Sequence, residues 1–389
     1  MKSDIVMISP FFSPNNGGVE TFLDDLILFL NINQQYVSVI AYQPLTTDVN
    51  SSIFENVNGN IIYRLPWVKF NLFYKLEKYP FLQLIYLSLG IGLFSLSYFI
   101  IGKGRRKKVV HCHGLAAGFV GFLLSFLVRK KFVLNFHTNY RFSKSQIIGR
   151  FVRFMIGRYD SVLTLSKACE DNLVEIGVPR EKISTYYNWV DEGTFNITDK
   201  SEARKEIGWQ ENEFYAIFVG RFSKEKGIFD LLKAIPLLDQ KIKIVIIGGG
   251  LGEASVRKIS DENPSVTYVG RKNTDELANY FNAADILVYG SIDEDYLGRV
   301  SISALHCGLP IMVPDKSYYG GKESKNTIEL PSDIGLVFKS NFKSFAKSLN
   351  HLYGNKGVAM FDRNSCKEYV RKIYGEEENG KIIMNTLIN

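Results

Sequence analysis

The chain has 389 residues, which is long enough for two domains of ordinary size. With 46% hydrophobic and 22% charged residues, and no internal repeat or low-complexity tract, it has the composition of a soluble or peripheral globular protein. Its four cysteines are widely spaced and form no CxxC pair, which argues against a disulfide framework or zinc site and favours reduced thiols in a cytoplasmic protein.

In the first half of the chain, short β-rich runs alternate with helical patterns. The opening residues MKSDIVMISP are interpreted as a strand rather than a signal peptide, because their apolar run is short and no cleavage site follows. Helical patterns such as VETFLDDLILFLN and KACEDNLVEIG separate the strands, and this order predicts a parallel sheet covered on both faces. The predicted strands are DIVMISP (4–10), YVSVIAY (36–42), NIIYRL (60–65), KVVHCHG (108–114), KFVLNFH (131–137), SVLTLS (161–166) and KISTYYN (182–188).

Positive charge is concentrated between Arg64 and Arg158. This stretch contains 17 Lys or Arg and one acidic residue, Glu77, whereas the whole chain has a net charge of +7, so the remainder is acidic overall. One interpretation is a solvated face on a basic protein. The other is a surface that attracts an anionic partner.

The same stretch contains the most apolar segments of the chain. The run 79–102 has 24 residues without a charge and is long enough to span a bilayer. A single crossing would place the strands predicted at 60–65 and 109–114 on opposite sides of the membrane, although both belong to one sheet. We therefore expect this run and 114–128 to form amphipathic or deeply packed helices. Their outer faces would touch the membrane interface, with Lys and Arg at anionic headgroups; a purely buried helical core is the alternative.

The alternating pattern breaks at a polar stretch near 191–212 and then restarts. The later strands are FYAIFVG (214–220), KIKIVIIG (241–248), VTYVG (266–270), DILVYG (285–290) and LPIMV (309–313). We therefore predict an α/β protein with two doubly wound Rossmann-like domains, 1–198 and 199–365, facing each other across a cleft. Residues 366–389 are predicted to form a helix that packs back toward the first domain. In this class ligands bind at the carboxyl ends of the strands and in the cleft.

Two glycine-containing loops are candidates for binding a diphosphate. In SPFFSPNNGGVETF (9–22), Gly17 and Gly18 stand between a strand and a helix start, where backbone N–H groups can approach an anion. In FVGRFSKEKGIFDLLKA (218–234), Arg221 and Lys226 flank a loop that Gly227 closes before a helix. A plain strand-to-helix turn and ordinary surface cations are the alternatives.

Two further stretches bear on metal binding. His113 and His137 each stand where a strand ends, but no carboxylate partner is evident. We expect a hydrogen bond from His137 to a bound sugar and a core position for His111. Asp293-Glu294-Asp295 matches a DxD metal motif only superficially, because that motif belongs to a different, single-domain architecture.

A set of pieces in a fixed order carries a resemblance to a known family. On this set the chain resembles glycosyltransferases of family 4, a retaining group with two Rossmann-like domains called GT-B. The pieces, in chain order, are SPNNGGVE, VVHCHG, FHT, SVLTLS, YYNWVDEGTF, FVGRFSKEKG, IKIVIIGGG, VTYVG and GLP.

The resemblance implies transfer of a sugar from a nucleotide diphosphate donor with retention of configuration, without a metal or other cofactor. Arg221 and Lys226 would neutralise the diphosphate and the charge on the leaving group. His137 matches the family histidine near the transferred sugar. Gly17 and Gly18 would lie near the diphosphate, and Gly298 would offer a backbone N–H.

The paired-glutamate motif of the family is altered. Counting back from Gly308 and Pro310 places its members at Asp295 and Ser303. Loss of the second carboxylate, which family members use to hold the ribose, would lower donor affinity about ten- to a hundredfold. We expect an active enzyme with a modified donor pocket. The alternatives are a catalytically weak partner subunit that binds sugar nucleotides, and a GT-B sugar-nucleotide epimerase.

The expected partners follow from the charge pattern and the resemblance. They are a nucleotide sugar, a glycan or lipid-linked acceptor and an anionic membrane surface, but no nucleic acid. We expect a cytoplasmic protein that is peripheral on the inner face of the membrane and acts in the synthesis of cell-surface polysaccharide or glycolipid.

Overall fold

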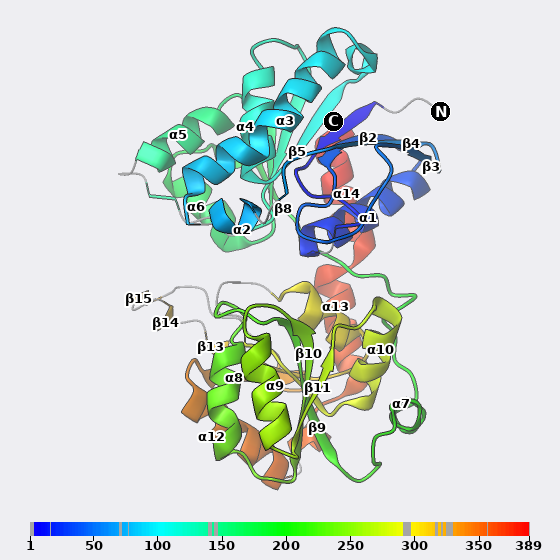
Figure 1. The fold of residues 1–389 in the computed structure, drawn as a ribbon, viewed down its shortest axis with the longest axis vertical. Helices are drawn as coiled ribbons and strands as arrows, with labels where there is room; N and C mark the ends of the chain where they lie inside the picture. Colours follow the sequence, from blue (N-terminus) through cyan, green and yellow to red (C-terminus); the bar gives the residue numbers. More distant parts are fainter. Residues whose placement is uncertain are drawn as a thin grey trace. The chain divides into compact units, whose positions relative to one another are not determined.

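Each half of the chain folds around its own parallel sheet (Figure 1). In this computed structural model the described residues are 4–388 except 16, 70–71, 77, 139–141, 144–146, 291–296, 316–317, 320–321, 324–329 and 356. Unit 1 comprises Met1–Asn188 and Glu376–Asn389, and unit 2 comprises Trp189–Gly375. The predicted pair of Rossmann-like sheets is confirmed.

The sheet of unit 1 has the order β3-β4-β2-β1-β5-β6-β7-β8. All neighbouring strands are parallel except β3 and β4, which form an antiparallel hairpin. Every strand predicted in this half is present, and β3 is an addition. The strands are β1 (Ile5–Ile8), β2 (Val37–Tyr42), β3 (Phe54–Val57), β4 (Asn60–Leu65), β5 (Val109–His113), β6 (Lys131–Asn135), β7 (Ser161–Thr164) and β8 (Ile183–Thr185).

Helices cover both faces of this sheet. Alternation along the strands sends Ile8 and Cys112 into one apolar core with residues of α3, α4, α5 and α6. Helices α1 and α14 pack against each other, with the ring of Phe29 beside Gly380. The helices of unit 1 are α1 (Gly18–Ile32), α2 (Leu72–Leu76), α3 (Pro80–Ile100), η1 (Lys103–Arg106), α4 (Gly114–Leu124), α5 (Ile147–Ile156), α6 (Lys167–Glu175), η2 (Arg180–Lys182) and α14 (Glu376–Ile388).

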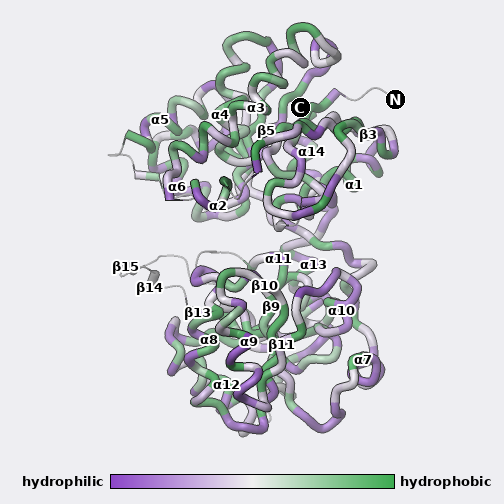
Figure 2. Tube along the Cα trace, viewed as in Figure 1, coloured by the Kyte–Doolittle hydropathy of each residue, from purple (hydrophilic) through white to green (hydrophobic). Residues whose placement is uncertain are grey.

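Helix α3 is the one helix in the described part of the chain that is long and apolar enough to cross a membrane by length and composition. It packs instead against α4 and β2 of the sheet, and its core-facing side chains include Leu87, Ile91 and Phe99. The strands before and after it, β4 and β5, belong to the same sheet, which is the topology that argued against a single crossing. Its outer face remains apolar (Figure 2), with Leu89 and Leu93 exposed.

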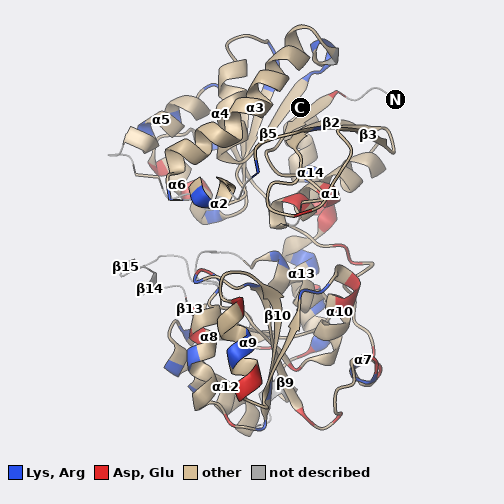
Figure 3. Ribbon diagram, in the orientation of Figure 1, with Lys and Arg blue, Asp and Glu red and all other residues tan. Residues whose placement is uncertain are grey.

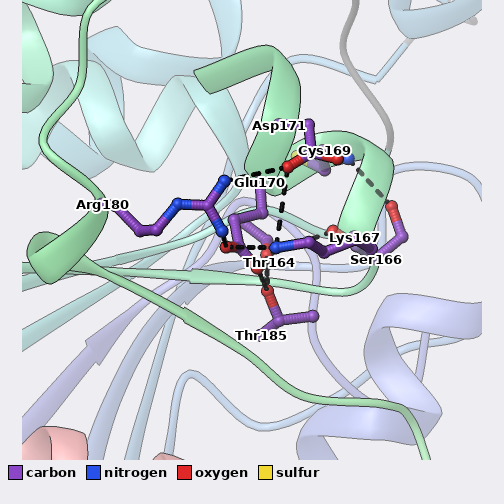
Figure 4. Close-up of polar contacts among 8 residues, drawn as sticks. All are labelled: Thr164, Ser166, Lys167, Cys169, Glu170, Asp171, Arg180 and Thr185. Carbon is purple, nitrogen blue, oxygen red and sulfur yellow. Dashed lines mark hydrogen bonds and ion pairs between the residues drawn. The ribbon is translucent and has the colours of Figure 1, made fainter. Parts of the chain in front are cut away.

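The ends of β7 and β8 are joined by an ionic network (Figure 4). Glu170, near the start of α6, accepts hydrogen bonds from Lys167 (2.7 Å), Arg180 (2.6 Å) and the Thr185 hydroxyl (2.8 Å). Ser166 caps α6 by accepting a hydrogen bond from a backbone N–H of its first turn. These contacts fix α6 to the edge of the sheet.

Unit 2 is built on a parallel sheet of order β11-β10-β9-β12-β13-β16. The strands are β9 (Phe214–Arg221), β10 (Ile242–Gly249), β11 (Val266–Gly270), β12 (Ile286–Val288), β13 (Ile311–Asp315) and β16 (Gly335–Lys339), with a separate hairpin of β14 (Tyr318–Tyr319) and β15 (Lys322–Glu323). The helices are α7 (Lys200–Ile207), α8 (Ile228–Ala234), η3 (Ile235–Leu237), α9 (Glu253–Glu262), α10 (Thr274–Ala283), α11 (Arg299–His306), α12 (Phe342–Gly354), η4 (Gly357–Met360) and α13 (Arg363–Tyr374).

The unit boundary differs from the predicted one at residue 198. The segment 189–198 belongs to unit 2 because Phe195 packs beside Phe281 and Thr198 N donates to Asn282 Oδ1 (2.8 Å). The predicted C-terminal segment 366–389 is divided between the units. Helix α13 packs on α11 of unit 2, whereas α14 belongs to unit 1, where Asn379 Oδ1 accepts from Tyr187 N (2.7 Å).

Candidate active site

The strand order reverses at one point in each sheet. In unit 1, β1 lies between β2 and β5, and in unit 2, β9 lies between β10 and β12. In open α/β sheets the ligand-binding crevice forms at the carboxyl ends of the strands at such a point. Gly17 and Gly18 follow β1, and Arg221 is the last residue of β9, so these candidates stand at the two reversal points.

The loop after β1 is built around the side chain of Glu20. Glu20 is buried in the first turn of α1, and its carboxylate accepts a hydrogen bond from the Asn15 amide. Asn15 Oδ1 accepts hydrogen bonds from the backbone N–H (3.1 Å) and the hydroxyl (2.7 Å) of Thr46. A Cβ at Gly17 would overlap the Glu20 carboxylate, so a larger residue cannot stand there without displacing it. A Cβ at Gly18 would meet nothing within 4 Å, so the space at this helix start is open.

A cluster of histidines lies at the carboxyl ends of β5 and β6. His113 Nδ1 and His137 Nε2 are 3.0 Å apart. The Asn135 amide nitrogen lies 3.0 Å from His137 Nε2 and 2.9 Å from the Tyr186 hydroxyl. The ring of Phe22, in α1, packs edge-on against His137 at 5.4 Å between centroids. His137 therefore stands near the glycine turn that begins α1.

These histidines are held in the neutral state. His111 and His113 are buried, and His137 is partly buried. Burial lowers the pKa of His111 to about 3 and holds the pKa of His113 and of His137 well below the usual value. A neutral imidazole offers one N–H donor and one acceptor, so His137 is suited to hydrogen bonding rather than to carrying a positive charge.

In unit 2 the loop after β9 is fixed by glycines of β10. Phe222 N donates to Gly249 O (2.9 Å). Gly248 has a φ of 136°, and a Cβ there would overlap the carbonyl oxygen of Gly220. This close approach of the two strands sets the backbone on both sides of Arg221, whose side chain is exposed.

The same loop ends beside β12. Gly227 is the N-cap of α8 with a φ of 77°, and a Cβ there would overlap the backbone of Gly290, which follows β12. Lys226, partly buried, precedes this contact. The structure therefore brings Arg221 and Lys226 to the carboxyl ends of the strands of unit 2. They lie beside β12, the strand that precedes the predicted positions of the paired-glutamate motif. Asp295 itself lies outside the described residues.

Helix α11 contains Ser303, the second predicted position of that motif. Gly298 is its N-cap in an extended conformation, and among the described residues no side chain caps this helix start. Ser303 is only 5% exposed, and its neighbours in α11 from Ser301 to His306 are buried as well. Arg299 Nη1 donates to Trp189 O (2.7 Å), which ties the first turn of the helix to the segment that opens unit 2. Ser303 thus has little surface with which to meet a ligand.

Sequence reasoning missed three residues near these positions. Asn135 and Tyr186 complete the hydrogen-bonded cluster around His137. Asn135 lies inside a predicted strand, and Tyr186 begins the piece YYNWVDEGTF, but neither residue was given a role. Arg271 is exposed just after β11, and a Cβ at Gly249 would lie 2.8 Å from its Nε. Arg221 was predicted because it is a cation directly after a strand. The same pattern also indicates Arg271.

Comparison with known proteins agrees with this geometry. Residues 16–193 match Glycosyltransferase Family 4, and residues 199–373 match Glycosyl transferases group 1. The solved structure of HepE from Anabaena in complex with UDP-glucose superposes with a TM-score of 0.70 at 16% identity, and the match covers 98% of each chain. The fold is therefore GT-B, the class of two-domain glycosyltransferases.

Curated relatives place the chain more narrowly. An uncharacterized glycosyltransferase of Methanocaldococcus jannaschii is 25% identical over 370 residues, 85% of each chain. The alpha-galactosylglucosyldiacylglycerol synthase of Streptococcus pneumoniae is 25% identical over 54% of this chain and 61% of that protein. The protein belongs to the family 4 type of glycosyltransferases, as its sequence motifs predicted.

Proposed function

We propose that this glycosyltransferase moves a sugar from a nucleotide diphosphate donor to a glycan or lipid-linked acceptor with retention of anomeric configuration. The observation that carries the proposal is the fixed loop of unit 2, which presents Arg221 and Lys226 at the carboxyl edge of the sheet beside the start of α8. Two cations at such a position suit a diphosphate. The UDP-glucose complex of HepE supports a nucleotide sugar as the donor.

Each candidate residue has a proposed role in this reaction. Arg221 and Lys226 neutralise the diphosphate and the charge that builds on the leaving group. His137 hydrogen-bonds to the transferred sugar through its neutral imidazole, held by Asn135. The remaining roles are a carboxylate contact to the sugar from Asp295, a hydroxyl contact to the ribose from Ser303, and backbone contacts from Gly17, Gly18 and Gly298.

The proposed reaction needs no metal or other cofactor, because the two cations of unit 2 supply the positive charge. Transfer should therefore continue at the same rate after treatment with EDTA. Loss of activity that Mg²⁺ or Mn²⁺ restores would contradict this part of the proposal.

We further propose that the acceptor is membrane-linked and that the protein works at the inner face of the membrane. The diacylglycerol-sugar synthase of S. pneumoniae supports such an acceptor class. In unit 1 large apolar side chains stay exposed on α3 and α5, and they include Phe81 (72%), Leu93 (62%) and Ile147 (82%). Lys and Arg stand in α5 (Figure 3) and in η1 just after α3, whereas α3 itself has none. This composition is typical of interfacial attachment.

A thermal-shift panel of nucleotide sugars tests the donor first. A bound donor raises the unfolding temperature by mass action, so the correct base and sugar should give the largest shift. The best donor is then used in a transfer assay with lipid extracts as acceptor. Donor binding without transfer to any acceptor or to water would instead favour a partner subunit, the alternative that the altered Asp295 and Ser303 pair suggests.

A further inference from the structure

A cationic groove lies in unit 1 at the amino ends of strands β5 and β6. Six basic residues line it: Lys107, Lys108, Arg129, Lys130, Lys131 and Arg158. The predicted site residues of this unit follow β1 and β6, at the carboxyl ends of these parallel strands. The groove lies at the other end of the strands. The groove is therefore distinct from the candidate active site.

The negative charges near the groove are too few to neutralise it. Asp160 is the one acidic residue of its lining, and its Oδ2 already accepts a hydrogen bond from Phe132 N (2.7 Å). Lys108 pairs with Asp4 at 3.1 Å, but Lys108 is 77% exposed, and such surface pairs contribute little. The six cations consequently produce a positive field that attracts phosphate groups.

One of these cations is held in place by neighbouring contacts. The Arg158 guanidinium lies over the Phe126 ring at 4.3 Å from its centroid and donates to the Ser125 hydroxyl and carbonyl, both at 3.3 Å. A guanidinium fixed at one end of the groove loses less conformational entropy when it binds a phosphate than a free side chain would.

Exposed apolar side chains border the same groove. Phe126 is 55% and Leu127 is 62% exposed, and both stand between α4 and Arg129. Ile101, just after α3, is 81% exposed, and it precedes η1, where the Arg105 carbonyl accepts a hydrogen bond from Lys130 of the groove (2.8 Å). A phosphate site bordered by exposed aliphatic side chains matches a bilayer surface, where headgroup phosphates lie next to the hydrocarbon.

We propose that this groove binds the phosphate groups of anionic membrane lipids while Ile101, Phe126 and Leu127 enter the interface beside it. Nucleic acid would satisfy the cations, but it offers no apolar environment for the two aliphatic side chains. The inference adds a lipid-phosphate site to the membrane attachment that the proposed function assigns to exposed residues of α3 and α5. It rests on unit 1 alone and needs neither a donor nor a transfer step.

The experiment compares vesicle binding by the full chain and three variants in a flotation assay. Vesicles contain phosphatidylcholine alone or mixed with phosphatidylglycerol. The groove variant is Lys108→Gln with Arg129→Gln and Lys130→Gln, and the apolar variant is Ile101→Ser with Leu127→Ser. The matched control is Lys233→Gln with Lys343→Gln and Lys347→Gln, three exposed lysines of α8 and α12 in unit 2. Unfolding temperatures establish that each variant is folded.

We expect wild type and control to bind the anionic vesicles alike and to lose binding as salt is raised. The groove variant should bind about a hundredfold more weakly, because each basic residue near an anionic surface contributes roughly fivefold. The apolar variant should also bind less. Groove-variant binding equal to wild type, or equal wild-type binding to both vesicle types, would overturn the proposal. So would binding to single-stranded RNA that requires the same three cations without any binding to vesicles.

A second readout separates this result from the proposed reaction. Sugar transfer to a soluble, detergent-dispersed acceptor should be unchanged in the groove variant, because the groove lies at the opposite edge of the sheet from the predicted site. A protein that binds vesicles through the groove but shows no transfer would contradict the proposed function and leave this inference standing.

Discussion

The side chains at the carboxyl ends of the strands differ between the two sheets: they are cationic in unit 2 and neutral in unit 1. In unit 2 the edge carries the exposed cations Arg221 and Arg271 and the partly buried Lys226. In unit 1 it carries neutral polar groups, with His113 and His137 in hydrogen-bond contact and Asn135 bonded to Tyr186. The same α/β topology therefore supports a charge-binding edge in one unit and a neutral hydrogen-bonding edge in the other.

The difference has a physical origin in burial. The histidines of unit 1 stand inside the sheet end, where desolvation disfavours the charged form. Arg221 is exposed and Lys226 is only partly buried, so neither side chain stands in the apolar core of unit 2. A diphosphate needs positive charge and a sugar needs neutral donors and acceptors, so the two edges suit different kinds of ligand group.

The strongest test of this comparison removes the two cations that are proposed to bind the diphosphate in unit 2. Arg221→Ala or Lys226→Ala should each raise the barrier to transfer by about 3 kcal/mol or more, because each removes a preorganised partner of the developing phosphate charge. Rates of transfer at saturating donor measure the effect. Lys224→Ala is the matched control, because Lys224 is exposed in the same loop and has no proposed role. Wild-type turnover by a folded Arg221→Ala, Lys226→Ala double variant would place the phosphate site elsewhere.

The ionic network around Glu170 in unit 1 is predicted to stabilise the fold rather than to take part in transfer. Glu170→Gln should lower the free energy of unfolding by about 1.5–3 kcal/mol, because hydrogen bonds to Lys167, Arg180 and Thr185 lose their charge assistance. Glu175→Gln, an exposed change on the same helix, should cost little. Chemical denaturation measures both. Loss of transfer activity by Glu170→Gln at unchanged stability would contradict the structural role.

The pH dependence of that contribution has a definite sign. Burial acts to raise the pKa of Glu170, but hydrogen bonds from Lys167 and Thr185 and the charges of Lys167 and Arg180 outweigh it, so the pKa in the folded protein is lower than usual. A lowered carboxyl pKa stabilises the fold above the unfolded value of 4.5, and this stability is lost as pH falls through the folded value. The difference between wild type and Glu170→Gln should therefore shrink in acid.

The buried neutral histidines are a second source of acid sensitivity. Here the proton is taken up by the unfolded chain rather than by the folded protein. The pKa of His111 falls from 6.5 to about 3 on burial, so only the unfolded chain takes up its proton between these values. Stability should then fall with pH below 6.5 by about 1.4 kcal/mol per unit for each such histidine. His111→Leu should make this slope shallower by that amount. Because neither ring nitrogen of His111 has a hydrogen-bond partner among the described residues, Leu should be tolerated at neutral pH. Unfolding at pH 7 and pH 5 measures the slope, and an unchanged slope would contradict a buried neutral His111.

The sequence predicted those parts of the molecule that local patterns determine. The alternation of strands and helices gave both sheets, because parallel strands are apolar along their whole length and stand out from the helices between them. Gly17, Arg221 and Lys226 were proposed as site residues because glycines and cations directly after a strand have a simple physical meaning, and their roles stay predictions.

Features that depend on distant contacts were not predictable in the same way. The boundary after Asn188 depends on Phe195 meeting Phe281, which no local pattern reveals. The cluster around His137 needs Asn135 and Tyr186 from different strands. The cationic groove combines residues after η1, after α4 and after α5, so the sequence showed only its total charge.

The smallest effect is expected where unit 2 departs from its family, at Ser303. Ser303→Ala should weaken donor binding by about 1 kcal/mol, since only a neutral hydrogen bond is lost. Ser303→Glu introduces a carboxylate at a position that is only 5% exposed, so the residues packed around α11 must shift to admit it. If it reaches the ribose, its carboxylate forms a charge-assisted hydrogen bond and the dissociation constant falls. Calorimetric titration with the best donor measures both variants, with Ser301→Ala, a change at a second buried serine of the same helix, as the control. Tight donor binding that neither Ser303 variant changes would show that this helix does not contact the ribose.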